Sequence, residues 1–293
     1  MKRYIVLPVV LLLLSVCASS FAAQQVKVGL NDVINTVESS FKAGKSGEAP
    51  IADFMADFFQ STLLVKDRRE MRGDGQVSVK LPNAATPLMY RFQYYRPYQQ
   101  EIVSDGNSLW IYHPENREVI LSDVSFIYNR PGFNPDRDQA VNFLQGLGRI
   151  SKDFQINFAA GMYDSAGNYV LELTPRRSML NTRRILLVVS RDSAISFVTQ
   201  KKPQSTTPSG IPSRPPSRPN FGPAEQFGPL PPIGGASDPF PLLSTTVEDQ
   251  EGNRTTMEFT NIRINNRFQQ SSFSFLIPPG VQVVKPSEQN QPR

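Results

Sequence analysis

Alternation of apolar and polar side chains is the feature of this sequence that most restricts its fold. The segments 76–81 and 88–94 both repeat with a period of two. Such a period is typical of antiparallel strands whose two faces differ in polarity. Asp105-Gly106 separates two apolar runs at 102–103 and 109–112, which indicates a hairpin turn. Further strands are expected at 119–121, 154–158, 169–173, 184–190, 243–248, 255–264 and 273–277. The chain is therefore expected to be mainly β, with a few helices.

Three short segments show helical spacing instead. Apolar residues over 30–41 form one stripe of a helix, and those over 51–58 predict a second short helix. A third helix is expected from Asn134, which can cap it, to Gly148, which can end it. Its apolar stripe includes Phe143, Leu144 and Leu147.

The N-terminus has the form of a secretory signal. Lys2 and Arg3 precede an apolar run from Tyr4 to Val16, and small residues follow with the spacing that a signal peptidase needs. Residues 1–22 are therefore predicted to be a cleaved signal peptide that exports the chain to the periplasm. Two alternatives stay open: an uncleaved anchor, or a lipoprotein acylated on Cys17, although Val16 departs from the small residue preferred before such a cysteine.

Residues 23–293 are predicted to be one domain, interrupted at 201–241 by a disordered insertion. Proline, serine and glycine dominate this insertion, so it offers little apolar surface to offset the entropy of ordering. Its P-x-x-P spacings leave open a docking role. A tolerated surface insertion is the simpler interpretation, because a longer loop costs little free energy.

Catalytic constellations are nearly absent from the sequence. His113 is the one histidine, Cys17 is the one cysteine, and we find no nucleophile elbow, P-loop or zinc-protease motif. We therefore expect a protein that is not an enzyme and has no catalytic residue, metal site or cofactor. A glycan hydrolase with two carboxylates stays open as a third class, although no particular pair stands out. The net charge of +5 comes without a dense basic run, which argues against nucleic acid as a partner.

Aromatic residues are abundant on the expected strands and short helices. A filled core accounts for any one of them. Many two-faced strands with few helices also fit a strongly curved antiparallel sheet, whose aromatic concave face is roofed by helices. A sheet of that shape encloses an apolar cavity in which an exported binding protein could hold a ligand.

These residues resemble the family of periplasmic outer-membrane lipoprotein carrier proteins, LolA. Residues 103–114 look like its V-S-D-G-x-x-L-W-x-Y-x-P hairpin. Weaker matches follow in order along most of the chain outside 201–241: Phe54, Phe58 and Gln60 to F-x-x-x-F-x-Q, 75–83 to G-x-x-x-V-K-x-P-N, 90–92 to an aromatic strand, and 273–283 to the C-terminal strand.

The resemblance implies an unclosed antiparallel β-barrel covered by a helical lid. It also implies a shuttle that binds lipoprotein acyl chains and carries them from an inner-membrane ABC transporter to an outer-membrane receptor. We expect the protein to be a monomer. On this basis the lipid-binding residues are expected to be Phe54, Phe58, Val79, Leu81, Phe92, Trp110, Phe143, Leu144 and Leu147.

One departure concerns the lid. Well-studied family members carry an arginine after the lysine of the 75–83 motif, and it is thought to latch the lid, whereas this chain has Leu81. Arg91 on the neighbouring strand is the candidate for a replacement latch. A periplasmic module of the same fold that senses lipids or lipoproteins, or a membrane-anchored acceptor, is the alternative function.

Overall fold

One continuous sheet organises the molecule. The computed structural model describes residues 26–44, 49–83, 85–125, 146–179, 182–201 and 240–285. Its strands are β1 (Asp53–Leu64), β2 (Arg69–Lys80), β3 (Met89–Arg96), β4 (Gln100–Ser104), β5 (Ser108–His113), β6 (Glu118–Asp123), β7 (Phe154–Tyr163), β8 (Tyr169–Pro175), β9 (Arg184–Val189), β10 (Leu242–Glu248), β11 (Arg254–Ile264) and β12 (Gln282–Val284). The sequence predicts all of these except β1 and β12, with β4 and β5 indicated by the hairpin turn between them.

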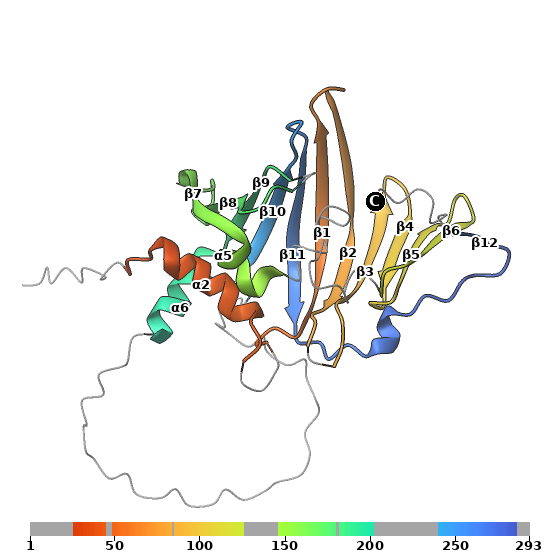
Figure 1. The fold of residues 1–293 in the computed structure, drawn as a ribbon, viewed down its shortest axis with the longest axis horizontal. Coiled ribbons are helices and arrows are strands. Elements are labelled where there is room, and N and C mark those ends of the chain that lie inside the picture. Colours follow the sequence, from red (N-terminus) through yellow and green to blue (C-terminus); the bar gives the residue numbers. More distant parts are fainter. Residues whose placement is uncertain are drawn as a thin grey trace, which may run out of the picture.

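The sheet is curved but not closed (Figure 1). Its strand order is β12-β6-β5-β4-β3-β2-β1-β11-β10-β9-β8-β7, so β12 and β7 are the two edges. All neighbouring strands are antiparallel except β12, which runs parallel to β6. The expected fold, an unclosed and mainly antiparallel β structure with a few helices, is confirmed.

Short helices cover one face of the sheet, which we call the concave face. They are α2 (Leu30–Phe41), the 3-10 turn η1 (Leu147–Arg149), α5 (Ile150–Asp153) and α6 (Arg191–Lys201). In Figure 1 they lie beside β7–β10. The helix expected at 30–41 is confirmed. Of the helix expected at 134–148, residues 134–145 lie outside the described part of the chain. None of the described helices has the length and apolar character needed to span a bilayer.

The helix expected over 51–58 is wrong, because these residues begin strand β1. Phe54, Ala56 and Phe58 are buried while Met55 and Asp57 are half-exposed, which is a period of two. Phe54 and Phe58 are four residues apart, a spacing that fits a helix face and a strand face equally well. Pairing with both β2 and β11 decides in favour of the strand, since Phe54 lies opposite Val79 on one side and Ile264 on the other.

The strand expected at 273–277 is also wrong. Gln270–Phe273 forms the 3-10 turn η2, and regular pairing resumes only in β12. We call residues 265–285 the C-terminal arm and the face of the sheet that it crosses the outer face. Phe273 is fully buried there, so this segment is held by side-chain burial rather than by a ladder of backbone hydrogen bonds.

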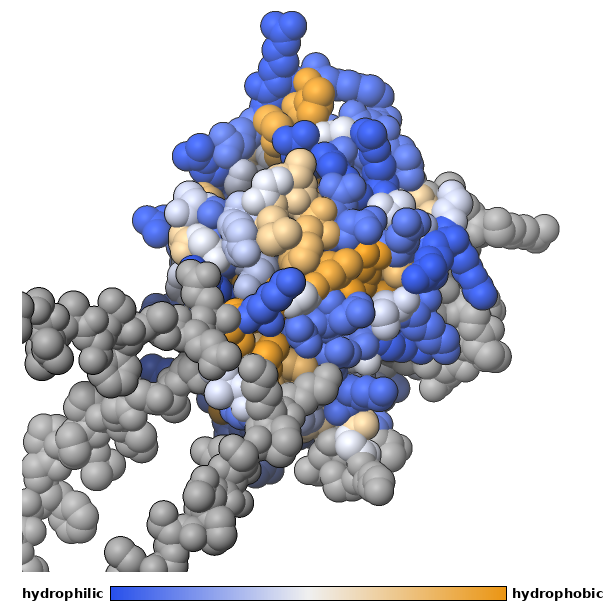
Figure 2. Space-filling view, turned by 90° about the vertical axis from the view of Figure 1, so that its left-hand side faces the viewer, coloured by the Kyte–Doolittle hydropathy of each residue, from blue (hydrophilic) through white to orange (hydrophobic). Residues whose placement is uncertain are grey.

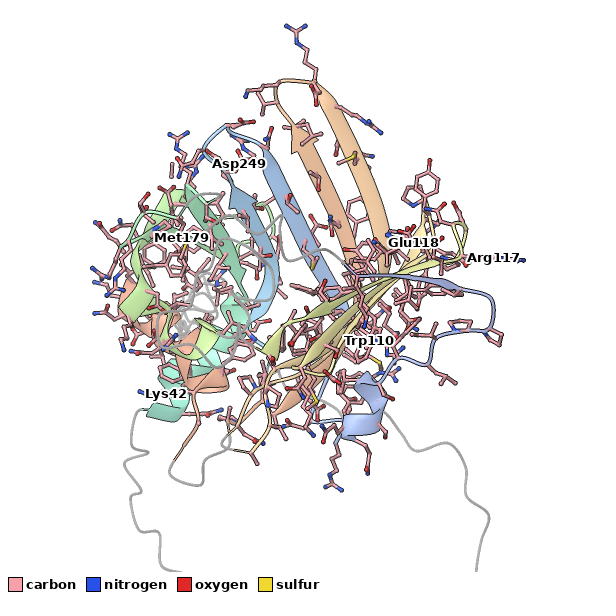
Figure 3. All side chains as sticks on the ribbon, turned by 45° about the vertical axis from the view of Figure 1, so that its right-hand side comes forward. Lys42, Trp110, Arg117, Glu118, Met179 and Asp249 are labelled. Carbon is pink, nitrogen blue, oxygen red and sulfur yellow. The ribbon has the colours of Figure 1, made fainter. Side chains whose placement is uncertain are left out.

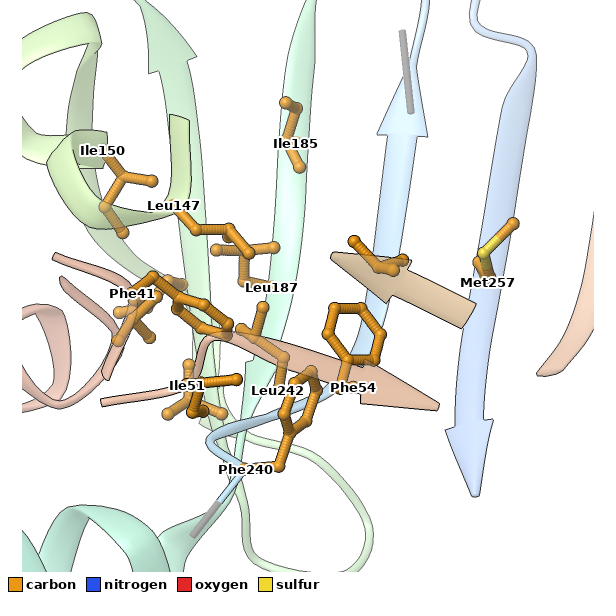
Figure 4. Close-up of a cluster of buried hydrophobic side chains, with 14 of the residues drawn as sticks. Phe41, Ile51, Phe54, Leu147, Ile150, Ile185, Leu187, Phe240, Leu242 and Met257 are labelled. Carbon is orange, nitrogen blue, oxygen red and sulfur yellow. The ribbon is translucent and has the colours of Figure 1, made fainter. Parts of the chain in front are cut away.

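The main core lies between the concave face and the helices (Figure 4). Phe41 of α2, Phe54 of β1 and Leu242 of β10 meet there. Phe240 and Pro241 are also buried, although they close the predicted disordered insertion. Phe240 and Pro241 therefore belong to the folded core, and residues 202–239 lie outside the described chain.

Candidate functional site

The concave face gathers most of the predicted lipid-binding residues. Phe54, Phe58, Val79, Leu81, Phe92 and Leu147 all belong to one cluster of buried apolar side chains. Phe143 and Leu144 lie outside the described residues. The common placement follows from the registers of β1, β2 and β3, which put Phe54 opposite Val79 and Val77 opposite Phe92. The lipid-binding role of these residues remains a prediction.

The helix-covered end of this face is filled by the protein itself. The ring of Phe240 lies 5.7 Å from that of Phe41, edge to face, and 4.8 Å from that of Phe54. Leu147 and Ile150 complete the packing there and are fully buried (Figure 4). This end is therefore ordinary core, and a ligand would have to displace it.

Towards β3–β5 the same face stays apolar but becomes partly exposed. Phe58, Phe92 and Tyr94 form edge-on aromatic contacts, with centroid distances of 5.7 Å for Phe58–Phe92 and 4.9 Å for Phe58–Tyr94. Half-buried Ile102 and Leu109 continue the surface across β4 and β5. We call these five residues the aromatic surface. Figure 2 faces the other side of the molecule, at β7, where apolar side chains also lie between hydrophilic ones.

Three residues of the aromatic surface were not singled out from the sequence. Tyr94 continues the alternation of Tyr90 and Phe92, so the strand pattern could have identified it. Ile102 and Leu109 could be found only from the register of the β4–β5 hairpin. That register pairs Ile102 with Ile111 and Ser104 with Leu109.

A glycine on β2 lets the strands of the aromatic surface approach closely. Gly75 lies opposite Tyr94 in β3 and Phe58 in β1. A Cβ added at Gly75 would lie 1.9 Å from the carbonyl oxygen of Gln93 and 3.0 Å from Cζ of Phe58. Glycine is therefore required for the close approach of this strand, which explains the first position of the G-x-x-x-V-K match.

Tyr94 brings a polar group to this apolar surface. Its hydroxyl donates a hydrogen bond to Oε1 of Gln60 at 2.8 Å. Burial raises the pKa of Tyr94 to about 12, so the hydroxyl remains protonated at neutral pH. The group is thus a neutral hydrogen-bond donor and acceptor at the edge of an apolar site.

Trp110 does not belong to the concave face. Leu109 packs against the main core, so its neighbours Trp110 and Ser108 point to the outer face. There the ring of Trp110 lies 6.5 Å from that of Phe275 in the C-terminal arm. Figure 3 labels Trp110 among the side chains of the molecule. Both faces of β5 carry apolar residues, and alternation therefore could not decide which one faces the cavity.

Arg91 also points to the outer face, away from α2. Its neighbours Tyr90 and Phe92 belong to the concave core, whereas its Nε and Nη2 donate to the carbonyl oxygens of Ser272 and Ser274 at 3.0 and 2.7 Å. Arg91 also pairs with Glu101. A latch on the helices would need the guanidinium on the other face, so the structure corrects that expectation: Arg91 holds the C-terminal arm.

The hairpin motif is explained by turn geometry rather than by ligand chemistry. Oδ1 of Asp105 accepts hydrogen bonds from the amides of Asn107 and Ser108 at 2.8 and 2.7 Å. Gly106 has a φ of 89° and packs against Pro87, so a Cβ there would be both strained and crowded. The motif therefore specifies a tight β4–β5 turn.

Polar groups elsewhere are arranged as structural pairs. Among the described residues, no group of three or more His, Cys, Asp or Glu side chains could hold a metal ion. Glu248 is buried on the outer face and accepts hydrogen bonds from Arg183, Arg184 and Arg254. Nε2 of His113 lies 3.5 Å from Nε2 of Gln100 at the end of β5.

Comparison with known proteins gives a consistent result. The family model of the outer membrane lipoprotein carrier protein LolA matches residues 50–205. An outer-membrane lipoprotein carrier protein of Xanthomonas oryzae pv. oryzae is 32% identical over 248 residues, which is 77% of this chain and 91% of that protein. One from Actinobacillus succinogenes is 29% identical over 83 residues, 28% of this chain, and this chain spans only 38% of its length.

A solved LolA superfamily protein of Nitrosomonas europaea is 14% identical and has a TM-score of 0.34, covering 85% of this chain and 99% of that one. The family match extends from the start of β1 past the end of α6, and it therefore includes every strand of the aromatic surface. The chain belongs to the LolA family of outer-membrane lipoprotein carrier proteins.

Proposed function

We propose that this protein is a periplasmic carrier that binds the acyl chains of lipoproteins against its concave face. The observation that carries the proposal is the aromatic surface, Phe58, Phe92, Tyr94, Ile102 and Leu109, which continues the core outward and stays partly exposed at Tyr94, Ile102 and Leu109. A soluble protein that leaves such a surface beside its own core offers an apolar ligand a continuous binding site.

The energetics of acyl chains fit this surface. Each CH₂ group that leaves an apolar phase for water costs about 0.8 kcal/mol, so a lipid anchor cannot cross an aqueous compartment unprotected. Aromatic and branched aliphatic walls bind such chains by area and not by an exact shape. The protein would therefore accept lipoproteins that share an anchor and differ in the attached polypeptide.

The proposal includes the direction of transport and the partners. The carrier would be a monomer that receives lipoproteins from an inner-membrane ABC transporter and delivers them to an outer-membrane receptor. It would act by binding alone, without a catalytic step. Membership of the carrier family supports this assignment.

A detergent-removal experiment tests binding. The purified mature protein is mixed with a labelled triacylated lipoprotein in detergent, the detergent is removed, and the soluble complex is isolated by gel filtration. We expect a soluble one-to-one complex, whereas precipitation of the lipoprotein in the presence of the folded protein would contradict the proposal.

Two matched variants locate the binding surface. Ile102→Glu places a charge on the aromatic surface, while Leu63→Glu places one on the exposed outer face of β1. We expect the first variant to lose the complex and the second to retain it, with circular dichroism as the control for folding. Retention of lipoprotein without delivery to outer-membrane vesicles that carry the receptor would favour a sensing module over a carrier.

A further inference from the structure

Polarity changes along the concave face of β1. The first concave side chains of this strand, Phe54, Ala56 and Phe58, are apolar and buried, whereas the next two, Gln60 and Thr62, are polar and half-buried. The change occurs beside the aromatic surface. A ligand lying along the strand would therefore meet an apolar wall first and hydrogen-bonding groups next.

The polar residues are connected to one another across strands. Nε2 of Gln60 lies 3.5 Å from Oγ1 of Thr62, and Oγ1 of Thr62 lies 3.3 Å from Oγ1 of Thr255 on β11. The Tyr94 hydroxyl joins them through Gln60. We call Tyr94, Gln60, Thr62 and Thr255 the polar track.

Two glycines allow Tyr94 to reach this track. Tyr94 is on β3 and Gln60 is on β1, so the strand β2 lies between them. At the crossing β2 presents Gly75 opposite Tyr94 and Gly73 opposite Gln60. A Cβ at Gly73 would lie 3.5 Å from Cδ1 of Tyr94, which shows that the tyrosine ring runs directly over this strand.

The track retains hydrogen-bonding capacity. A primary amide has two donor hydrogens, and those of Gln60 have only the long contact to Thr62 among the described residues. The Tyr94 oxygen donates to Gln60 and has lone pairs that can accept another bond. Threonine hydroxyls rotate, so Thr62 and Thr255 can each turn a donor towards a ligand.

We propose that the polar track binds the ester carbonyls at the glyceryl end of a lipoprotein anchor and thereby sets the direction in which the anchor lies. The acyl chains would run over Phe58 and Phe92, and the glyceryl group would lie at Gln60 and Thr62. The modified cysteine and the attached polypeptide would leave beyond Thr62, where β2 presents exposed Met71 opposite Thr62.

This inference rests on the proposed function and adds a chemical preference to it. A purely apolar site would bind ester-linked and ether-linked chains equally. A site that donates a hydrogen bond to a carbonyl favours the ester, because a net hydrogen bond contributes about 0.5–1.5 kcal/mol, which is roughly a two- to tenfold difference in affinity.

The test compares two synthetic lipopeptides that differ only in their linkage. One carries ester-linked chains on the glyceryl group, and the other carries ether-linked chains of the same length. Their dissociation constants are measured with the mature protein and with the variants Tyr94→Phe and Gln60→Leu. Tyr95→Phe serves as the control, because Tyr95 is the adjacent tyrosine and is exposed.

We expect the unaltered protein and the Tyr95→Phe variant to prefer the ester about fivefold. We expect Gln60→Leu to lose the preference and Tyr94→Phe to reduce it. The ratio of affinities cancels any general loss of binding or folding, as in a double-mutant cycle.

Three results would overturn the inference. Equal affinity of the unaltered protein for the two lipopeptides would exclude recognition of the carbonyls, and an unchanged ratio in both track variants would place recognition elsewhere. Failure of the unaltered protein to bind either lipopeptide would overturn the proposed function as well, and this result is distinct from the other two.

Discussion

The rings of Phe240 and Phe54 lie 4.8 Å apart, centroid to centroid, and join the end of a proline-rich segment to the first strand of the sheet. Phe240 also contacts Phe41 of α2 edge-on. Only 1% of its surface is exposed. Phe240 therefore helps to fasten the return of the chain to the core, two residues before β10 begins.

Phe240→Ala is expected to destabilise the protein by about 3–5 kcal/mol, because it leaves a cavity between α2 and β1. Urea unfolding followed by circular dichroism measures the change. Phe59→Ala is the matched control: this side chain is 42% exposed and should cost less than about 1 kcal/mol. Similar losses in the two variants would contradict the anchoring role of Phe240.

Gly75→Ala is expected to destabilise the fold by about 1–3 kcal/mol or to prevent folding. The added methyl group would overlap the backbone carbonyl of Gln93 at 1.9 Å, and a backbone atom cannot move aside cheaply. Gly146→Ala provides the control, because a Cβ there meets nothing within 4 Å. The free energy of unfolding from urea titration should fall only in the first variant; a Gly75→Ala protein of unchanged stability would refute the close approach.

Glu248 predicts a pH dependence of stability. Burial raises the pKa of its carboxyl, but hydrogen bonds and charge from Arg184, with the charges of Arg254 and Arg183, outweigh this effect and lower the pKa below its usual value. Because the folded pKa is lower than the unfolded one, the carboxylate contributes stability above the unfolded value of about 4.3. That contribution is lost as the pH falls through the folded pKa.

Glu248→Gln should therefore cost about 2 kcal/mol at pH 7, where charged hydrogen bonds are replaced by neutral ones. The difference from the unaltered protein should shrink below about pH 4. Thermal unfolding across pH 3–8 would measure it. Glu251→Gln breaks an exposed pair with Lys66 and should have little effect on stability at any pH. If the stability difference between Glu248→Gln and the unaltered protein stayed constant down to the lowest pH, the pKa of Glu248 would not be lowered by folding.

Arg91→Ala is expected to loosen the C-terminal arm while leaving the concave core intact. The change removes donors to the carbonyl oxygens of Ser272 and Ser274 and leaves Glu101 without its partner. Hydrogen exchange of the β12 amides should become about tenfold faster, because local opening needs fewer bonds to break. Exchange in α2 should not change. Arg72→Ala, which removes an exposed pair with Glu70, is the control; faster exchange in α2 and not in the arm would revive a latch on the helices.

The sequence predicts most of the sheet because alternation needs only local information. Strands such as β2 and β3 carry apolar residues on the core side and polar ones on the other, and this pattern is readable without a partner strand. The pattern did not identify β1 as a strand, because the spacing of Phe54 and Phe58 suits a helix as well as a strand. Only pairing with β2 and β11 distinguishes the two.

The candidate site was predicted in part for a related reason. Val79 and Phe92 lie on β2 and β3, where alternation separates an apolar from a polar face, so the pattern placed them on one face. Phe58 lies on β1, which alternation did not predict, and it was found only through the F-x-x-x-F-x-Q match. Trp110 lies on β5, where both faces are apolar, and its contact with Phe275 comes from a segment 165 residues later. No local pattern contains that information.

By itself the sequence determined the mainly β character of the chain, the tight turn at Asp105-Gly106 and the family to which the chain belongs, since each depends on residues close together in the chain or on short motifs. Tertiary structure decided that residues 53–64 form a strand, that Arg91 and Trp110 face the C-terminal arm, and that Tyr94 crosses two glycines to reach Gln60. The reason is physical. Which face of a strand is buried, and which side chains meet across it, depends on the elements that pack against it, and these come from distant parts of the chain.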